Sequence, residues 1–470
     1  MKPIPRRPLF PLITDLLEYQ QAANNTIPYT KKMVEKYGDV CDVSFTGVRN
    51  YFIHDPEVIK EILNTQSLKF KRTYLFRAFR KFLGQGLFTS DGEFHKQQRK
   101  LIKPAFYPQR ITNYASIMVQ CASDEINTWK DGQIINVNQA MTRITLNVIT
   151  KTLFGSQLND ELIGFVGRKL AEAFIITNRI CSNPFYVYCL DKEIRIPLIV
   201  RFFEIKSELY KVIDRIISEY RTDNKSGGLD LLSMLMEAKD EDSKTGMTDE
   251  QVRDEVMTFL IAGHETTTIA LTWTWYLLGK SPDIALKLQE EVNSILAGRL
   301  PTADDYQSLH LTKNIFRESL RLYPPAWTFA REAIEDVVLN GYHFPKGSVL
   351  WTVTYLLHHS EKYFYKPEEF IPGRWDEEKI NDLPKYAYFP FGGGNRMCIG
   401  EGFAWMEGVL VLATIASRFQ LKFENDFSTV INPLFSLKTK EQVMMTVRSQ
   451  PHNATGENIP VMEVISSGAR

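Results

Sequence analysis

The chain has little cysteine and no net charge. It holds five cysteines in 470 residues, and their scattered positions fit neither a disulfide framework nor a zinc site. Lysine plus arginine and aspartate plus glutamate both number 56, so no bulk charge favours nucleic acid or an anionic membrane surface. We therefore expect no nucleic-acid partner, and a reducing cytoplasm is the expected location.

The chain also lacks a long hydrophobic run. Near the N-terminus, basic residues precede an apolar stretch that Pro8, Pro11 and Asp15 interrupt well short of a signal peptide or a membrane span. We therefore expect no membrane anchor. Hydrophobic residues nevertheless make up 44% of the chain and aromatic residues 12%, which is enough to bury the core of a large enzyme.

Turn signals and hydrophobic periodicity predict a mainly α fold with a smaller β-region. Strands are predicted near 38–55 and 333–355, and helices near 56–325 and 399–420. The two β-rich segments are expected to pair across the helical middle. Residues 1–450 are expected to form one domain and residues 451–470 a weakly ordered tail.

A glycine-rich loop, FGGGNRMCIG at 391–400, presents Cys398 just before an apolar helical pattern. Three consecutive glycines contribute no side chains and indicate a backbone that passes close to something large and flat. Free N–H groups and the positive end of the following helix dipole favour a thiolate at Cys398. Such a thiolate can be a nucleophile, a redox thiol or a metal ligand. A buried structural cysteine is the alternative.

A second pattern, AGHETTT at 262–268, interrupts the apolar run of a long helix whose start is marked by a capping box at Thr248 and Gln251. Glycine and consecutive β-branched threonines are poor choices inside a helix, so the run invites a local distortion unless something is gained. This conflict indicates a function. A zinc-protease HExxH site is excluded because Thr268 stands where the second histidine is needed. The alternative is that the threonines bond back to the helix and Glu265 is a paired core acid.

A third pattern places Glu318 and Arg321 one turn apart on a helix that a double proline ends. Alone, such a pair is usually a solvated ion pair of little energetic consequence. Arg374, in KPEEFIPGRW, adds an arginine shortly before the cysteine loop. The occurrence of all three patterns in this order along the chain is stronger evidence for a function than any one of them alone.

Together these patterns resemble one protein family. The motif F-x-x-G-x-R-x-C-x-G, formed by Phe391, Gly394, Arg396, Cys398 and Gly400, resembles the haem-binding loop of the cytochrome P450 superfamily of haem-thiolate monooxygenases. AGHET resembles that family's oxygen-activating segment, and the Glu-x-x-Arg pair with its later arginine resembles the family's structural ion network. The resemblance covers nearly the whole chain and is closest in layout to the soluble bacterial type. It implies the P450 fold, a triangular prism with a long central helix over the haem.

The resemblance implies haem b as the cofactor and Cys398 as its iron ligand. Phe391 would shield the sulfur, N–H groups such as those of Ile399 and Gly400 would moderate its charge, and Arg396 would pair with a haem propionate.

On the long helix, Ala262 and Gly263 would let the backbone approach the haem. Thr266 would stabilise dioxygen through hydrogen bonds, with Thr267 as a substitute, while Glu265 would help deliver protons through water.

Further basic residues take their roles from the same resemblance. Arg99 would contact the propionates, and His95 stands where the family commonly carries a tryptophan. Arg331 resembles another arginine of the propionate cluster. Glu318, Arg321 and Arg374 would brace the cysteine loop. Three lysines on the helix of Arg99 could face an acidic redox partner, or could form a solvated face: Lys96, Lys100 and Lys103.

The activity implied is insertion of one atom of dioxygen into a lipophilic substrate. A fatty acid is the first choice, because AGHETT and the layout resemble bacterial fatty-acid hydroxylases, while terpenoids, steroids and polyketides stay open. Electrons would come from a separate ferredoxin or flavodoxin and its reductase, since no flavin or iron-sulfur module remains. A monomer is expected. The alternatives are a peroxide-driven or rearranging haem-thiolate enzyme and a non-catalytic haem sensor.

The substrate pocket is expected to be roofed by segments 69–88 and 174–188, with 326–330 entering it. The candidate lining residues, for which core packing is the alternative, are Phe76, Phe79, Phe82, Leu83, Leu87 and Phe88.

Overall fold

The computed structural model describes residues 1–7, 25–45, 48–73, 76–155, 159–181, 183–222, 230–239, 245–376 and 383–450. The predicted tail at 451–470 lies outside the described residues. The α-helices are α2 (Thr26–Tyr37), α3 (Pro56–Lys60), α4 (Phe76–Leu83), α5 (Gly92–Ile102), α6 (Pro108–Ile126), α7 (Val137–Phe154), α8 (Asp160–Cys181), α9 (Pro184–Asp191), α10 (Pro197–Thr222), α11 (Leu231–Glu237), α12 (Asp249–Lys280), α13 (Pro282–Leu296), α14 (His310–Leu322), α15 (Thr354–His358) and α17 (Glu401–Ala416). The strands are β1 (Val40–Asp42), β2 (Asn50–Ile53), β3 (Phe70–Lys71), β4 (Ile134–Asn136), β5 (Phe329–Ala333), β6 (Val337–Leu339), β7 (Tyr342–Phe344), β8 (Val349–Thr352), β9 (Phe419–Lys422), β10 (Ile431–Pro433), β11 (Leu437–Thr439) and β12 (Met444–Ser449).

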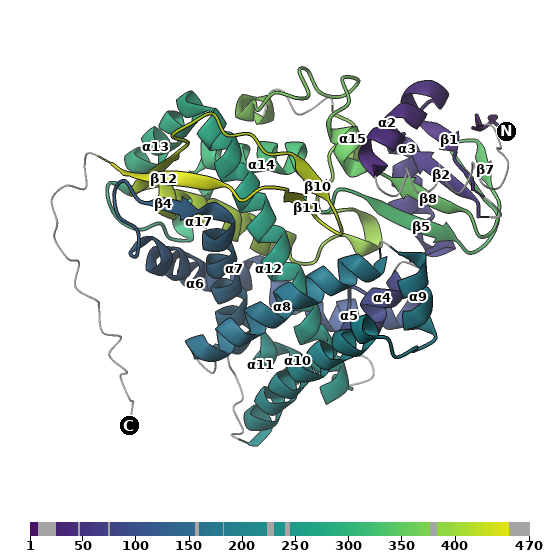
Figure 1. Cartoon of the computed structure of the whole chain (residues 1–470), viewed down its shortest axis with the longest axis horizontal. Helices are drawn as coiled ribbons and strands as arrows, with labels where there is room; N and C mark the ends of the chain where they lie inside the picture. The colour runs from purple at the N-terminus through teal and green to yellow at the C-terminus, as the bar shows by residue number, and fades with distance from the viewer. Residues whose placement is uncertain are drawn as a thin grey trace.

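The helices and the largest sheet occupy different parts of the molecule. Figure 1 shows β1, β2, β5 and β8 gathered on the right with α2, α3 and α15, while the long helices fill the centre and the left. This sheet has the order β1-β2-β8-β5-β3, and β2 pairs with β8 in parallel. Strands from the early and the late segment therefore pair across the helical middle, as the sequence predicts. The mainly α fold with a smaller β-region is confirmed.

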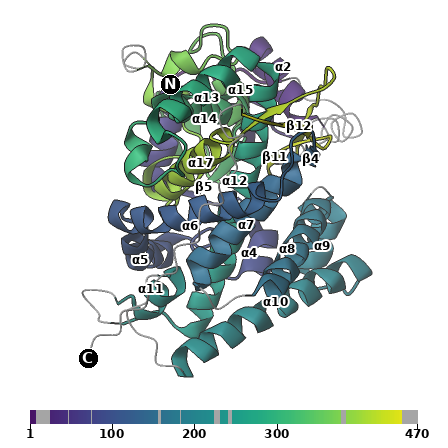
Figure 2. The same cartoon turned by 90° about the vertical axis from the view of Figure 1, so that its left-hand side faces the viewer.

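The long helix α12 passes through the middle of the helical part (Figures 1 and 2). Its start is fixed by the predicted capping box: Thr248 Oγ1 accepts a hydrogen bond from Gln251 N at 3.2 Å, and Gln251 Oε1 accepts one from Thr248 N at 2.8 Å. Most of its residues are buried, because α7, α10, α14 and α17 pack around it. A helix buried on nearly all sides is apolar all round, which explains its weak amphipathic pattern.

The AGHETTT segment lies within the continuous helix α12, without the local distortion that its residues invite. Residues 249–280 form one continuous α-helix. The threonines satisfy their hydroxyls inside the helix: Thr266 Oγ1 donates to Ala262 O at 2.7 Å, and Thr268 Oγ1 donates to His264 O at 3.0 Å. Burial against neighbouring helices outweighs the low intrinsic helix propensity of these residues.

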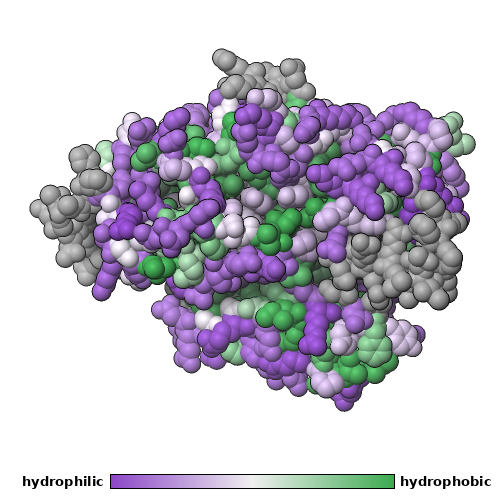
Figure 3. All heavy atoms as spheres, turned by 45° about the horizontal axis from the view of Figure 1, so that its top comes forward, coloured by the Kyte–Doolittle hydropathy of each residue, from purple (hydrophilic) through white to green (hydrophobic). Residues whose placement is uncertain are grey.

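The surface is mostly polar on the face drawn in Figure 3, with apolar side chains in separate small groups. No helix among the described residues is long and apolar enough to cross a membrane. The apolar residues are instead collected in two large buried clusters, one around α6, α7, α12 and α17 and the other around α4, α8, α10 and the first half of α12. The candidate site lies between elements of both clusters.

Candidate active site

Cys398 lies in the loop that enters α17. Its backbone N–H donates to Phe391 O at 2.9 Å, and this bond folds the loop back on itself. Desolvation by the surrounding protein atoms raises the pKa of the Cys398 thiol to about 11, and the N–H of Gly400 and the charge of Arg99 oppose this effect. The residue itself is exposed. The N–H of Gly400 and the charge of Arg99 act on the sulfur in the predicted direction, and the role of Cys398 as nucleophile, redox thiol or metal ligand stays a prediction at this point.

The glycines of the loop are explained by neighbouring protein groups. A Cβ at Gly394 would lie 1.7 Å from Leu63 O, and a Cβ at Gly393 would lie 2.6 Å from the ring of Tyr386. Gly392 and Gly394 also have positive φ, which glycine adopts at little cost. The predicted close approach of the backbone exists, but the partners that require it are the turn at Glu61–Thr65 and Tyr386.

Glu318, Arg321 and Arg374 form the predicted ion network. Arg321 donates to both carboxylate oxygens of Glu318, at 2.9 and 2.8 Å, and Arg374 Nε donates to Oε1 at 2.8 Å. Glu318 and Arg321 are completely buried. The indole of Trp375 donates to Oε2 of Glu318 at 2.8 Å, a contact that the sequence analysis missed. Both carboxylate oxygens of Glu318 accept hydrogen bonds, as a buried charge requires.

The network is connected to the cysteine loop through His358. Arg321 Nη1 donates to His358 O at 2.8 Å, and the imidazole Nε2 of His358 accepts the N–H of Phe389 at 3.2 Å. Phe389 O in turn accepts the N–H of Gly392. Burial lowers the pKa of His358 far below its ordinary value, so the ring is neutral and can accept this bond. The bracing role predicted for the ion network thus has a continuous set of contacts.

On α12, Ala262 and Thr266 are the exposed residues in the middle of a buried helix. They are four residues apart and share one face. Thr267 is buried and lies on another face, so Thr266 is the better placed of the two threonines. Helix α12 packs against α17, the helix that follows Cys398. The pair of small residues therefore leaves open space on one side of an otherwise covered helix.

Gly263 contacts a neighbouring helix. A Cβ at this position would lie 2.9 Å from Cδ1 of Ile149 on α7. The missing side chain therefore allows α12 to pack closely on α7. That Ala262 and Gly263 let the helix backbone approach the haem stays a prediction.

Glu265 is buried and paired with the hairpin formed by β10 and β11. Its Oε1 accepts a hydrogen bond from Ser436 Oγ at 3.1 Å and forms an ion pair with Lys438 Nζ. Burial raises the pKa of Glu265, and Lys438 and Ser436 oppose that effect. The carboxylate thus points to the hairpin, and it has partners that no sequence pattern identified.

Four arginines from distant parts of the chain form a cationic cluster: Arg72, Arg99, Arg331 and Arg396. The imidazole of His95 lies among them, and burial together with their charges lowers its pKa to about 3. Burial and mutual repulsion also lower the pKa of Arg72, Arg331 and Arg396, and the charge of Asp91 acts in the opposite direction on all three.

This cationic cluster fits an anionic ligand. Nε of Arg72 is buried without a hydrogen-bond partner. One carboxylate, Asp91, which accepts a bond from Arg396, does not balance the charges of several arginines. Like charges that are partly desolvated are costly unless an anion joins them. A flat group with two carboxylates and a central metal ion would match the cluster, the thiol of Cys398 and the small residues of α12, so the residues present fit haem.

The aromatic candidates divide into residues buried in the core and residues that are partly exposed. Phe82, Leu83 and Leu87 are buried in the core, and the ring of Phe82 packs on Phe202 at 5.1 Å between centroids. Phe88 and Phe76 are partly exposed, 5.4 Å apart between centroids. Both pack with Phe79, whose ring lies 4.3 Å from that of Phe435. We call the group formed by Phe76, Phe79, Phe88 and Phe435 the aromatic wall. The hairpin that pairs with Glu265 contributes Phe435 to it.

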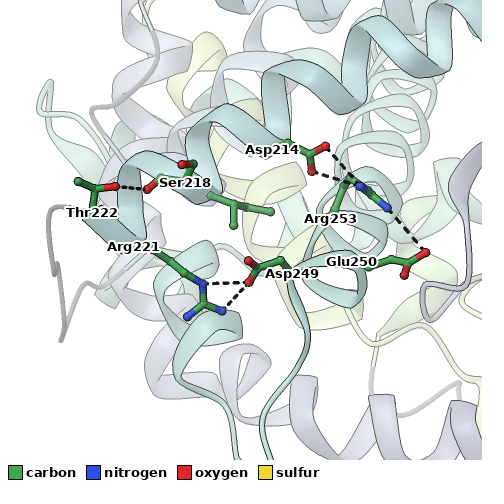
Figure 4. Close-up of a pocket in the computed structure, with 8 residues that line it drawn as sticks. Asp214, Ser218, Arg221, Thr222, Asp249, Glu250 and Arg253 are labelled. Atoms are coloured by element: carbon green, nitrogen blue, oxygen red, sulfur yellow. Dashed lines mark hydrogen bonds and ion pairs between the residues drawn. The ribbon is translucent and has the colours of Figure 1, made fainter.

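A separate polar cavity of about 440 Å³ lies between α10 and the start of α12 (Figure 4). Ion pairs join its charged side chains: Arg221 contacts Asp249, and Arg253 contacts Asp214. Thirteen residues separate Arg253 from Thr266, which places this cavity roughly 20 Å along the helix from the exposed threonine. It is not part of the site.

Comparisons with known proteins agree with this geometry. The family model described as Cytochrome P450 matches residues 4–446. The chain is 33% identical to cyclooctatin synthase of Streptomyces melanosporofaciens over 82% of this chain and 83% of that protein, and 31% identical to pentalenene oxygenase of Streptomyces avermitilis over 83% and 86%. The crystal structure of the cytochrome P450DA heme domain superposes with a TM-score of 0.84 at 28% identity, covering 96% of this chain and 98% of that one. The chain therefore belongs to the cytochrome P450 family of monooxygenases.

Proposed function

We propose that this protein inserts one atom of dioxygen into a terpene-type lipophilic substrate at a haem b ligated by Cys398. The observation that carries the proposal is the acid followed by an alcohol on α12, Glu265 and Thr266, on a helix packed against the one that follows Cys398. A haem sensor needs no such pair, and a peroxide-driven or rearranging enzyme usually lacks it. Arg72, Arg99, Arg331, Arg396 and His95 would hold the propionates, and Phe391 would cover the sulfur side.

The proposed substrate differs from the fatty acid favoured by the sequence resemblance. Relatives with about a third of residues identical are named for cyclooctat-9-en-7-ol and pentalenene, and none of these names refers to a fatty acid. A fatty-acid carboxylate would need an available cation near the aromatic wall. Lys438 is paired with Glu265, and Arg72 belongs to the cationic cluster. A mostly hydrocarbon substrate suits Phe76, Phe79, Phe88 and Phe435 better.

The side chains on α12 would manage protons. When bound, the haem supplies the activation of dioxygen, which consumes two electrons and two protons. The hydroxyl of Thr266 lies on the open face and bonds to Ala262 O, a weak local bond that it can exchange for a bond to a ligand. Glu265 holds a carboxyl group one residue away, so a proton can pass from it to the open face once the carboxyl group leaves Ser436 and Lys438.

Electrons would come from a separate ferredoxin or flavodoxin and its reductase. The lysines of the α5 region that could meet an acidic partner, Lys96, Lys100 and Lys103, are all exposed. We further propose one catalytic domain over residues 1–450, a monomer, and a cytoplasmic location.

The carbon monoxide difference spectrum of the reduced holoprotein tests the haem ligation. A strongly red-shifted Soret band that Cys398→Ala abolishes is expected for thiolate ligation. A holoprotein without this band would contradict the assignment of Cys398.

Substrate class is tested by titrating the oxidised holoprotein with pentalenene and with dodecanoic acid, and by analysing the products of reconstituted turnover. Tighter binding and oxygenation of pentalenene are expected. Preferential oxygenation of dodecanoic acid would restore the fatty-acid assignment.

A further inference from the structure

The turn between α4 and α5, residues 84–88, is attached to the side of α12. Gln85 N donates to Asp254 Oδ2 at 2.7 Å, and two residues later Leu87 N donates to Glu255 Oε2 at 2.9 Å. Both acids are buried inside the molecule. Two consecutive side chains of α12 therefore hold alternate backbone N–H groups of the turn.

The glycines of the turn allow this attachment. Gly84 has φ of 72°, and a Cβ there would lie 2.1 Å from Oδ2 of Asp254. A Cβ at Gly86 would lie 2.3 Å from Oγ1 of Thr258 and 2.7 Å from the backbone oxygen of Asp254. The turn and the helix are thus in contact at the level of the backbone, which only glycine permits.

Further hydrogen bonds hold Asp254 and the turn in place. The hydroxyl of Tyr210 on α10 donates to Oδ1 of Asp254 at 3.0 Å. Thr89, which follows the turn, donates from Oγ1 to Gly84 O at 2.7 Å. Burial raises the pKa of Glu255 to about 8, and Asp254 adds to this effect. A buried acid retained next to a second buried acid costs stability, so its contact with the turn needs a functional explanation.

Phe88 follows directly after the attached turn. Its ring lies 5.4 Å from Phe76 and 6.2 Å from Phe435, and it is partly exposed. Phe88 is the next residue after Leu87, whose N–H is bonded to Glu255, so a shift of the turn moves the ring of Phe88. Glu255 also lies seven residues before Ala262, hence on the same face of α12. The turn is therefore bonded to the same helix that carries Thr266.

We propose that Asp254 and Glu255 are positioning residues that set how far Phe88 reaches into the substrate pocket, and that they thereby determine which substrate shapes the protein accepts. This inference rests on the proposed function, because it assigns the aromatic wall to substrate. Fixing the turn by two hydrogen bonds favours compact polycyclic substrates, since a ring that cannot swing aside excludes long flexible chains from one side.

The test uses Glu255→Leu, which removes the acceptor at similar size, and Glu255→Gln, which keeps an acceptor oxygen. The control is Glu250→Gln, an exposed acid on the same helix with 78% of its side chain accessible. Hydrogen exchange at the Leu87 amide of the holoprotein is expected to rise at least about fivefold in Glu255→Leu, as loss of one hydrogen bond implies, and to stay within about twofold in the other two variants.

Binding supplies the functional readout. The ratio of the dissociation constants of dodecanoic acid and pentalenene is expected to fall at least about threefold in Glu255→Leu and to recover in Glu255→Gln. Unchanged exchange at Leu87, or changed exchange with an unchanged ratio, would overturn the proposal. Gly86→Ala, which pushes the turn away from α12 without removing the acid, should change the ratio in the same direction, and keeps the test decisive if Glu255→Leu does not fold.

Failure of the proposed function gives a different result. A holoprotein that binds neither compound and oxygenates no lipophilic substrate would remove the assignment of the pocket. Exchange at Leu87 would still decide whether the two acids hold the turn.

Discussion

The two sides of the site are built differently. On the cysteine side, Glu318 accepts bonds from Arg321, Arg374 and Trp375, and this buried network continues to the loop of Cys398 through His358. On the α12 side, Thr266 has only a bond to its own helix, and Glu265 is held by an ion pair with a hairpin. The comparison teaches that the proposed iron-binding side is fixed by many mutually dependent bonds, whereas the side proposed to handle protons is held by a few bonds that can open.

The largest effect should come from breaking the fixed side. Arg321→Met leaves Glu318 as a buried charge with fewer partners, and the free energy of unfolding of the holoprotein should fall by about 3–5 kcal/mol, with loss of haem. Urea unfolding and the haem absorbance measure this. The control is Arg215→Met, which removes an exposed i,i+4 pair with Glu219 and should cost less than about 0.5 kcal/mol. Equal losses in both variants would contradict the comparison.

On the other side, Thr266→Ala should leave the fold intact but damage coupling. Without the hydroxyl on the open face, proton delivery fails, so product formed per electron consumed should fall at least about tenfold, while peroxide increases. Thr266→Ser keeps the hydroxyl and should retain most of the coupling. Product and peroxide are measured against consumption of reductant. If coupling in the alanine variant equalled that of the wild type, Thr266 would have no role in proton transfer.

The smallest effect concerns the ion pair that keeps Glu265 on the hairpin. Burial raises the pKa of Glu265 in the folded protein. Stability is therefore lost as pH rises from the ordinary glutamate pKa to the pKa of Glu265 in the folded protein, because the folded state resists ionisation of the carboxyl group. Lys438 reduces this loss of stability. Lys438→Met should therefore raise the pKa of Glu265 further. Its effect on stability should be small near pH 5 and grow as pH rises to 8, because only the ionised carboxylate needs the lysine.

Infrared spectra of the resting protein can follow this titration directly. The carboxyl band assigned by its loss in Glu265→Gln should persist to higher pH in Lys438→Met than in the wild type. Lys438→Arg should restore the wild-type titration, and Lys440→Met, an exposed lysine two residues further on, should leave it unchanged. A band that titrates identically in Lys438→Met would show that the pair does not control Glu265.

Much of the cysteine side could be predicted because its residues occur in local motifs. The loop around Cys398, the pair Glu318 and Arg321, and the start of α12 at Thr248 each have a signature within a few residues. The capping box is confirmed in detail because both of its hydrogen bonds lie within one turn. Arg374 was found by its position before the loop, although Trp375, its neighbour, was not recognised as a donor to Glu318.

The remaining site residues gave no local signal. Arg72 belongs to a run of basic residues, and nothing nearby shows that it meets Arg331 and Arg396. Lys438 lies in an alternating hairpin where a lysine is ordinary. The undistorted α12 and the packing of Gly263 on Ile149 were missed for the same reason: propensity is local, whereas burial by neighbouring helices is not.

The sequence by itself determined the family, the cysteine loop that is the candidate ligand site, the acid followed by an alcohol on the long helix, and the ends of many elements, since these depend on residues close together in the chain. Only the tertiary structure decided which groups meet across the chain. It assembled the arginine cluster from segments hundreds of residues apart, turned Glu265 to Lys438, and attached the 84–88 turn to Asp254 and Glu255. Burial raises the pKa of Glu265, because desolvation depends on everything packed around a group.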